Sequence, residues 1–156
     1  MKFIVDNNVG RLTGWLRALG HDTLFINPIE DDDLIDVARR EGRTILTKDT
    51  GILRRRVITS GEVPALYVEG DDWRVQLGQV VRDLDLDPQP TFVRCIECNT
   101  PLERRTRDQA QPHVPPYVHR TQEEFLACPK CGRHYWKGTH WQRMREEIGR
   151  AVRREG

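Results

Sequence analysis

The chain has 156 residues, of which 37% are hydrophobic and 31% are charged, and its formal net charge is +1 at pH 7. This length suits one ordinary domain, or a compact domain with a small appendage. No apolar run approaches the roughly 20 residues that a membrane-spanning helix needs, and the N-terminus has no apolar segment followed by the small-residue cleavage site of a secretory signal. We therefore expect a cytoplasmic protein without a membrane partner, in which thiols stay reduced.

The charges are unevenly distributed along the chain. Residues 1–90 carry 16 acidic and 12 basic side chains, whereas residues 91–156 carry 8 acidic and 13 basic ones. A basic second part keeps nucleic acid open as a partner, although the net charge of the whole chain is near zero. Ordinary scatter in surface charge is the alternative explanation.

Strand and helix patterns alternate through the first 86 residues, with short polar breaks between them. Such alternation predicts an α/β domain with a parallel sheet that is covered on both faces. Right-handed crossovers with short loops favour a sheet in which the second strand lies at one edge, followed by the first, the third and the fourth. The expected strands are residues 2–5, 22–26, 43–47 and 64–68, and the expected helices are residues 9–19, 31–41, 53–56 and 72–84.

Acidic residues follow three of the expected strands where the chain turns. Asp6 ends the first strand, and Asp49 follows the third. The loop after the second strand leads to Asp31, Asp32 and Asp33. Taken singly, each acid can be explained as a helix cap. In the expected strand order, however, the strands end at one edge, where open α/β sheets bind ligands.

Carboxylates that converge on one edge either share protons or hold a cation. Oxygen ligands suit Mg²⁺ or Mn²⁺, and these ions can bind phosphate oxygens and activate a water molecule. The acidic edge therefore predicts a metal site for phosphodiester hydrolysis.

A polar stretch with two prolines, residues 87–90, separates an expected first domain (residues 1–88) from a second part (residues 91–156). Two CxxC pairs lie in the second part, and their members are Cys95, Cys98, Cys128 and Cys131. Two such turns place four thiolates around one tetrahedral Zn²⁺ ion. Because protein fills every position, this zinc is expected to be structural. The alternatives are an iron–sulfur cluster, disulfides or a redox dithiol.

Two other features of the second part bear on its structure. Residues 104–120, between the cysteine pairs, are rich in arginine and proline and are expected to form an exposed excursion that can be partly ordered. Tyr135, Trp136 and Trp141 follow the second pair, and we expect them to form the small core of a metal-bound module. Stacking of these rings on nucleic acid bases is the alternative.

Four stretches of the chain together resemble one known family. They read FIVDNNVGRLTGWLRALGHDTLFI, EDDDLIDVARREGRTILTKDTGIL, RCIECNTPL and FLACPKCGRHYWKGTHWQRM. They are similar, in the same order, to the Mut-seven C-terminal RNase domain, and the resemblance covers roughly residues 2–148. It implies a PIN-like three-layer domain with a central parallel sheet, a zinc ribbon after it, and metal-dependent ribonuclease activity.

The resemblance also implies roles for individual residues. Asp6, Asp31 and Asp49 match acids of the family and are expected to be catalytic residues that hold Mg²⁺ or Mn²⁺, and Asp32 or Asp33 is close enough to substitute for Asp31. A further acid of the kind that PIN-like domains assemble is not identified. The basic side chains expected to contact RNA are Arg11, Arg17, Lys48 and Arg54. Arg11 and Arg17 can equally belong to the solvated side of the first helix.

The leading hypothesis is a metal-dependent ribonuclease whose basic zinc ribbon helps to hold RNA, with tRNA, rRNA and mRNA all open as substrates. One alternative is a non-catalytic adapter that binds RNA or the ribosome through the zinc ribbon. Another is a toxin-like nuclease controlled by an antitoxin-like protein. A homodimer is a further expectation, because PIN-like domains often dimerise.

Overall fold

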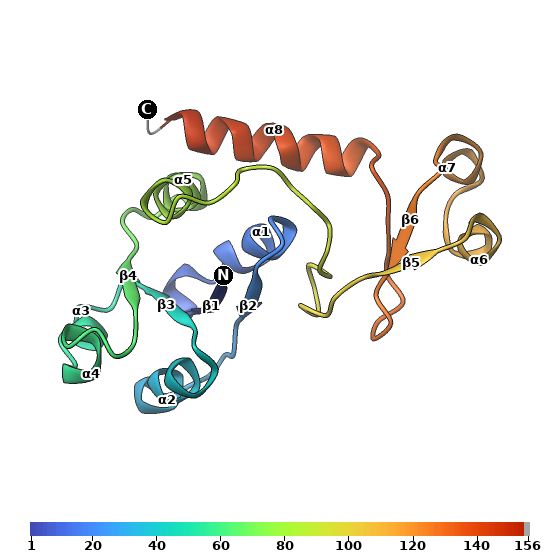
Figure 1. The fold of residues 1–156 in the computed structure, drawn as a ribbon. Helices are drawn as coiled ribbons and strands as arrows, with labels where there is room; N and C mark the ends of the chain where they lie inside the picture. Colours follow the sequence, from blue (N-terminus) through green and yellow to red (C-terminus); the bar gives the residue numbers. More distant parts are fainter. Residues whose placement is uncertain (155–156) are drawn as a thin grey trace.

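The computed structural model describes residues 1–154, and its first part is built on a four-stranded parallel sheet. The strands are β1 (Lys2–Val5), β2 (Asp22–Leu24), β3 (Thr44–Thr47) and β4 (Ala65–Tyr67). Their order across the sheet is β2-β1-β3-β4, and every neighbouring pair is parallel. The expected strand order is therefore confirmed, and β1 and β3, which precede Asp6 and Asp49, lie side by side (Figure 1).

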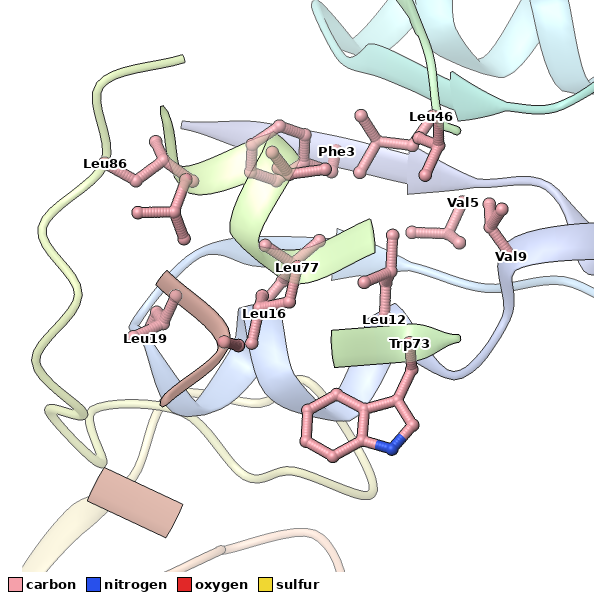
Figure 2. Packing of buried hydrophobic residues seen from close by; sticks show 14 of the residues in the cluster. Phe3, Val5, Val9, Leu12, Leu16, Leu19, Leu46, Trp73, Leu77 and Leu86 are labelled. Carbon is pink, nitrogen blue, oxygen red and sulfur yellow. The ribbon is translucent and has the colours of Figure 1, made fainter. Parts of the chain in front are cut away.

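One face of the sheet is covered by helices from both halves of the chain. Successive residues of a strand point to opposite faces, and Phe3 and Val5 of β1 face this layer together with Leu46 of β3. They form one buried cluster with apolar residues of the helices, such as Leu16 and Leu77 (Figure 2). The helices of this layer are α1 (Leu12–Ala18), α5 (Trp73–Asp83) and α8 (Thr139–Arg154).

The other face of the sheet is covered by helices that lie between β2 and β4 in the chain. Ile4 of β1 and Ile45 of β3 are fully buried there against Leu34 and Ile52. The helices of this layer are α2 (Asp31–Glu41), α3 (Thr50–Leu53) and α4 (Arg56–Thr59). The two covered faces confirm the expected α/β class.

The last helix packs against the first part of the protein. α8 packs against α5 (Figure 1), and Ile148 and Ala151 are fully buried in the same cluster as Phe3. The division into residues 1–88 and 91–156 stays a prediction about domains, but the packing of α8 does not follow it. An apolar stripe in a helix sequence indicates which side of the helix is buried, but it does not indicate which element that side packs against.

The second part contains an antiparallel sheet. Its strands are β5 (Glu103–Arg105), β6 (Phe125–Ala127) and β7 (His134–Tyr135), in the order β5-β6-β7. Residues 104–120 are mostly exposed, as expected, and more of this segment is ordered than an open loop would be. It contains α6 (Arg107–Ala110), η2 (Gln111–His113) and α7 (Pro116–Thr121). Ala110, Val118 and Phe125 are buried together as a small core of their own.

Within residues 1–154, no helix combines the length and the apolar character that crossing a membrane requires.

Candidate functional site

Asp6 is held in place by hydrogen bonds to both carboxylate oxygens. Its backbone N–H extends the β1–β3 ladder by donating to the Leu46 carbonyl at 2.9 Å, and its side chain caps η1 (Asn7–Val9). Oδ1 accepts from the Asn7 N–H at 2.8 Å, and Oδ2 accepts from the Thr47 hydroxyl at 2.7 Å. Asp6 is 93% buried, so the acid lies at the floor of the sheet edge with a fixed orientation.

Asp49 is oriented by the same threonine. The Asp49 backbone N–H donates to Thr47 Oγ1 at 2.9 Å, so the Thr47 hydroxyl donates to Asp6 and accepts from Asp49. The Asp49 carboxylate caps α3, because Oδ1 accepts from the Gly51 N–H at 2.7 Å. Thr47 is fully buried. The sequence analysis assigned it no role, although the LTKD string contains it.

Asp31 begins α2, and its electrostatics show that the three acids lie near one another. Partial burial raises the pKa of Asp31 above its ordinary value, and the charges of Asp49 and Asp6 raise it further. Arg55 acts in the opposite direction and lowers this pKa. The structure therefore brings together the three acids that the sequence singled out, from three separate loops.

The three acids are close, but their oxygens do not form a closed cage. Within the part of the chain that the structure describes, only the four cysteines form a group of three or more acids, cysteines or histidines whose ligand atoms all lie within 4.8 Å of one another. The carboxylate oxygens are the hard donors that Mg²⁺ and Mn²⁺ prefer, and Mg²⁺ usually keeps several water ligands. The donor set fits such an ion, with water completing the coordination.

Basic side chains border the acids. Lys48 lies between Thr47 and Asp49, and its ammonium group donates to the Gly70 carbonyl at 2.7 Å and to Asp71 Oδ1 at 2.6 Å. Arg55 was missed by the sequence analysis. Its Nη1 contacts Asp32 Oδ1 at 2.7 Å, and the charges of Asp32, Asp31 and Asp49 together with this bond raise its pKa. The only sequence signal for it is the run of arginines at 54–56.

The remaining predicted RNA contacts lie in different places. Arg54 is exposed at the end of α3, one residue before Arg55. Arg11 lies just after η1, and its guanidinium is 5.8 Å from the centroid of the buried Trp73 ring. Contact with RNA stays a prediction for both.

The four cysteines lie in two turns with matching hydrogen bonds. Cys95 N–H donates to Thr100 O, and Cys128 N–H donates to Arg133 O, each at 2.9 Å. The residue after each pair, Asn99 or Gly132, has a positive φ of 66° or 81° and donates back to the first cysteine carbonyl at 2.9 Å.

The sulfur geometry fits a tetrahedral ion. Cys95 and Cys131 Sγ atoms are 3.8 Å apart, which equals the S–S edge of about 3.8 Å that follows from Zn–S bonds of about 2.3 Å. All four cysteines are free rather than disulfide-bonded. Tyr135 is buried beside them, and its hydroxyl is 3.3 Å from Cys95 Sγ and 3.0 Å from the Ile96 N–H.

The thiols have unequal tendencies to ionise. Burial opposes ionisation of Cys95, but the hydrogen bonds from Tyr135 and from backbone N–H groups outweigh it and lower its pKa to about 7. Burial and the neighbouring sulfurs raise the pKa of Cys98 to about 12. A divalent cation is what allows such neighbouring thiols to ionise together, so the donor set and the spacing fit zinc.

Residues 1–148 match the model of the Mut7-C RNAse domain family. The chain belongs to this family. The resemblance noted in the sequence is thereby confirmed, and membership indicates a nuclease-type function with RNA as the substrate. Searches of curated proteins and of solved structures found no match.

In this Mut7-C chain, Arg17 lies away from the acids and joins the two parts of the protein. Its Nη1 donates to the carbonyls of Ile96 at 2.8 Å and Glu97 at 3.1 Å, and its Nε donates to the Thr23 carbonyl at 3.0 Å. The Thr23 N–H in turn donates to Asn99 Oδ1 at 2.9 Å. The Mut7-C sheet is thus capped at its β2 edge by the first cysteine turn, and these contacts account for Arg17 without RNA.

A hollow of about 830 Å³ lies on the cysteine-bearing part of the Mut7-C chain. Trp136, Arg104, Arg105 and Lys137 are among its lining residues. Tyr135 also reaches it but is buried, which agrees with the expectation that this ring belongs to the core. The hollow is distinct from the acidic edge, because none of its lining residues is one of the three acids.

Proposed function

We propose that this protein is a ribonuclease that uses Mg²⁺ or Mn²⁺ at the acidic edge. The observation that carries the proposal is that Thr47 contacts both Asp6 and Asp49, at 2.7 Å and 2.9 Å, at the carboxyl edge of the sheet. Asp31 belongs to the same group of acids, because the charges of Asp49 and Asp6 add to the effect of burial in raising its pKa. Repulsion among three carboxylates is relieved by a divalent cation. Such an ion supplies charge stabilisation for a phosphoryl group and lowers the pKa of bound water.

The residues of the chain supply orientation and charge for the reaction. In the proposed hydrolysis, the oxygen of a water molecule attacks the phosphorus, and the bond from phosphorus to the leaving oxygen breaks. Thr47 holds Asp6 in place and fixes the backbone of Asp49. We assign Lys48 and Arg55, which pair with Asp71 and Asp32, to the phosphates next to the bond that breaks.

The proposal is tested by removing charge from the acids one at a time. Asp6→Asn and Asp49→Asn are expected to lower RNA cleavage by on the order of 100-fold or more at saturating Mn²⁺. Asp36→Asn is the matched control, because Asp36 is an exposed acid of α2 that pairs with Arg40 at 3.0 Å. Cleavage by folded Asp6→Asn and Asp49→Asn proteins at the rate of the control would rule the proposal out.

The proposal assigns the four cysteines to a structural Zn²⁺ and gives the zinc ribbon a role in holding RNA. Arg11 and Arg54 are retained as RNA-binding candidates, whereas Arg17 is not. A cytoplasmic location and a homodimer remain part of the hypothesis, and control by an antitoxin-like protein remains an alternative to a free enzyme. Size measurement of the protein purified from its native cells tests the last two together, because either partner adds mass.

A second candidate function is an RNA- or ribosome-binding adapter without catalysis. The hollow beside Trp136 favours it, because arginines and a partly exposed aromatic ring suit nucleic acid. In this case RNA binding survives Asp6→Asn and Asp49→Asn but is lost in Cys128→Ser, in which the zinc ribbon loses a ligand.

A further inference from the structure

Two exposed aromatic side chains flank the acidic edge. Of the Phe, Tyr and Trp side chains in residues 1–154, only Phe25, Tyr67 and Tyr117 are exposed, with 37%, 39% and 62% of their surface accessible. Phe25 directly follows β2, and Tyr67 is the last residue of β4. Because β2 and β4 are the outer strands of the parallel sheet, the two residues lie at its carboxyl edge, on either side of Asp6 and Asp49.

Tyr67 lies in the same row of the sheet as Thr47, which contacts Asp6. It is the register partner of Thr47, whose hydroxyl donates to Asp6 at 2.7 Å. Register partners on neighbouring parallel strands present their side chains on the same face. Neighbouring strands lie about 4.8 Å apart, which places Tyr67 about 10 Å from Asp6, with Thr47 between them.

Phe25 lies against the turn on the other side of Asp6. Asp6 caps η1, and Gly10 ends it. A Cβ atom at Gly10 would be 2.9 Å from Cε1 and Cζ of Phe25, so the ring occupies the space that a side chain at position 10 would need. The glycine therefore allows an aromatic ring to lie directly beside the turn that Asp6 begins.

Cations and aromatic rings are combined around the acids in the way that suits an RNA strand. Surfaces that follow single strands use basic side chains for the phosphates and aromatic rings for the faces of the bases. Lys48 follows Thr47 in the chain, and Arg55 contacts the neighbouring Asp32. Aromatic rings left exposed at this edge thus have a chemical partner in the bases of the same strand.

We propose that Phe25 and Tyr67 are base-stacking residues, which hold bases on either side of the RNA bond that lies at the acidic edge. This inference rests on the proposed function, because it takes RNA as the ligand of that edge. The two residues come from the outer strands on opposite sides of the acids, and the backbones of these strands are about three strand spacings, or about 14 Å, apart. Phe25 follows Leu24 and lies on the side of Gly10, whereas Tyr67 lies on the side of its register partner Thr47. They therefore stack on different bases and fix the position of the strand relative to Asp6 and Asp49.

The test uses a short single-stranded RNA that carries 2-aminopurine, a base whose fluorescence falls when it stacks. The full-length zinc-loaded protein is titrated without added Mg²⁺ or Mn²⁺, so that binding is measured and cleavage is not needed. The variants are Phe25→Ala and Tyr67→Ala, with Tyr67→Phe and Phe25→Tyr as variants that keep a ring. The ring-retaining variants are the matched controls, because they change the same two positions and keep an aromatic face for stacking.

The wild-type protein is expected to quench the fluorescence of a 2-aminopurine near the bound bond. Each alanine variant is expected to weaken RNA binding by about 5- to 100-fold and to reduce the quenching, as loss of one stacked base predicts. The ring-retaining variants are expected to stay within about twofold of wild type. Binding by Phe25→Ala and Tyr67→Ala equal to that of the ring-retaining variants overturns the inference, and so does a wild-type protein that binds no RNA.

The outcomes separate this inference from the proposed function. Quenching that depends on the two rings, in a protein that does not cut RNA with Mn²⁺, supports stacking and contradicts the nuclease. Cleavage that proceeds equally well in Phe25→Ala and Tyr67→Ala supports the nuclease and contradicts stacking.

Discussion

At the scale of single residues, Thr47 connects the two acids of the inner strands. Its hydroxyl donates to Asp6 and accepts from the Asp49 backbone, and the side chain is fully buried. A buried group that loses its hydrogen-bond partner keeps the cost of its desolvation. Removal of the Thr47 hydroxyl is therefore expected to disturb the positions of both Asp6 and Asp49.

Thr47→Val tests this connection because it keeps the shape of the side chain and removes the hydroxyl. We expect the free energy of unfolding to fall by about 1–3 kcal/mol in urea denaturation, and RNA cleavage to fall with it. Thr13→Val is the matched control. Thr13 Oγ1 is buried without a hydrogen-bond partner in the described part of the chain, so its removal is expected to raise stability by about 1 kcal/mol. Equal effects of the two substitutions would contradict the role of Thr47.

A second residue-scale prediction concerns pH and Asp31. Burial and the charges of Asp49 and Asp6 raise its pKa in the folded protein, so the folded state binds more protons than the unfolded state between the two pKa values. Stability from this group is thus present at low pH and is lost as pH rises through the raised pKa. Without divalent ions, the free energy of unfolding of wild type minus that of Asp31→Asn is expected to fall from pH 4 to pH 7. A difference that rises with pH would show that the acids do not repel one another.

At the scale of elements, the first cysteine turn covers the outer edge of β2, where a further strand would otherwise pair. The backbone N–H and C=O of Thr23 are satisfied by the Asn99 amide and the Arg17 guanidinium. The Asn99 Nδ2 also donates to Asp22 Oδ1 at 2.7 Å. An exposed edge strand would otherwise offer these groups to other chains. Cys95 and Cys98 belong to the turn that carries Asn99, so we expect the proposed zinc ion to support this edge of the parallel sheet.

Asn99→Gly is expected to lower the free energy of unfolding by about 2 kcal/mol, because two hydrogen bonds are lost, one of them to a carboxylate. Asn99→Ala is expected to cost about 1 kcal/mol more, since position 99 has a φ of 66° and a Cβ atom is strained in that conformation. Hydrogen exchange of the Thr23 amide is expected to accelerate in both variants.

Removal of zinc by a chelator gives the control for this element. Exchange at Thr23 and in β5–β7 is expected to accelerate, while the amide of Ile45, in the fully buried part of the sheet, stays protected. Protection of Thr23 that survives both zinc removal and Asn99→Gly would show that the turn does not support β2.

At the scale of the whole molecule, the last helix of the chain returns to the first part and completes its larger core. α8 follows the cysteine-bearing part in sequence but buries Ile148 and Ala151 with Phe3 and Leu16. α8 is also tied to α5 by an ion pair, Arg74 Nε to Glu147 Oε2, at 3.2 Å. The two parts are therefore joined both at the β2 edge and through the last helix.

Ile148→Ala is expected to lower the free energy of unfolding of the parallel-sheet part by about 2–5 kcal/mol, because a fully buried side chain leaves a cavity. Val152→Ala on the same helix is the control, with an expected cost of about 1 kcal/mol, since Val152 is only partly buried. The free energy of unfolding of each variant is measured by urea denaturation, and the protection of the Phe3 amide is measured separately by hydrogen exchange. Unchanged protection at Phe3 in Ile148→Ala would show that α8 is not part of this core.

The sequence by itself determined the alternation of strands and helices, the strand order and the grouping of the four cysteines, and it predicted a site at the sheet edge near Asp6, Asp31 and Asp49. These features depend on local periodicity, on short connections and on spacings of two residues, which are all visible along the chain. Only the tertiary structure decided which groups within the chain contact one another. Arg17 binds carbonyls of the cysteine turn, Arg55 contacts Asp32, and α8 packs on α5. A pattern shows that a face is apolar or a group is charged, but its partner depends on how the whole chain packs.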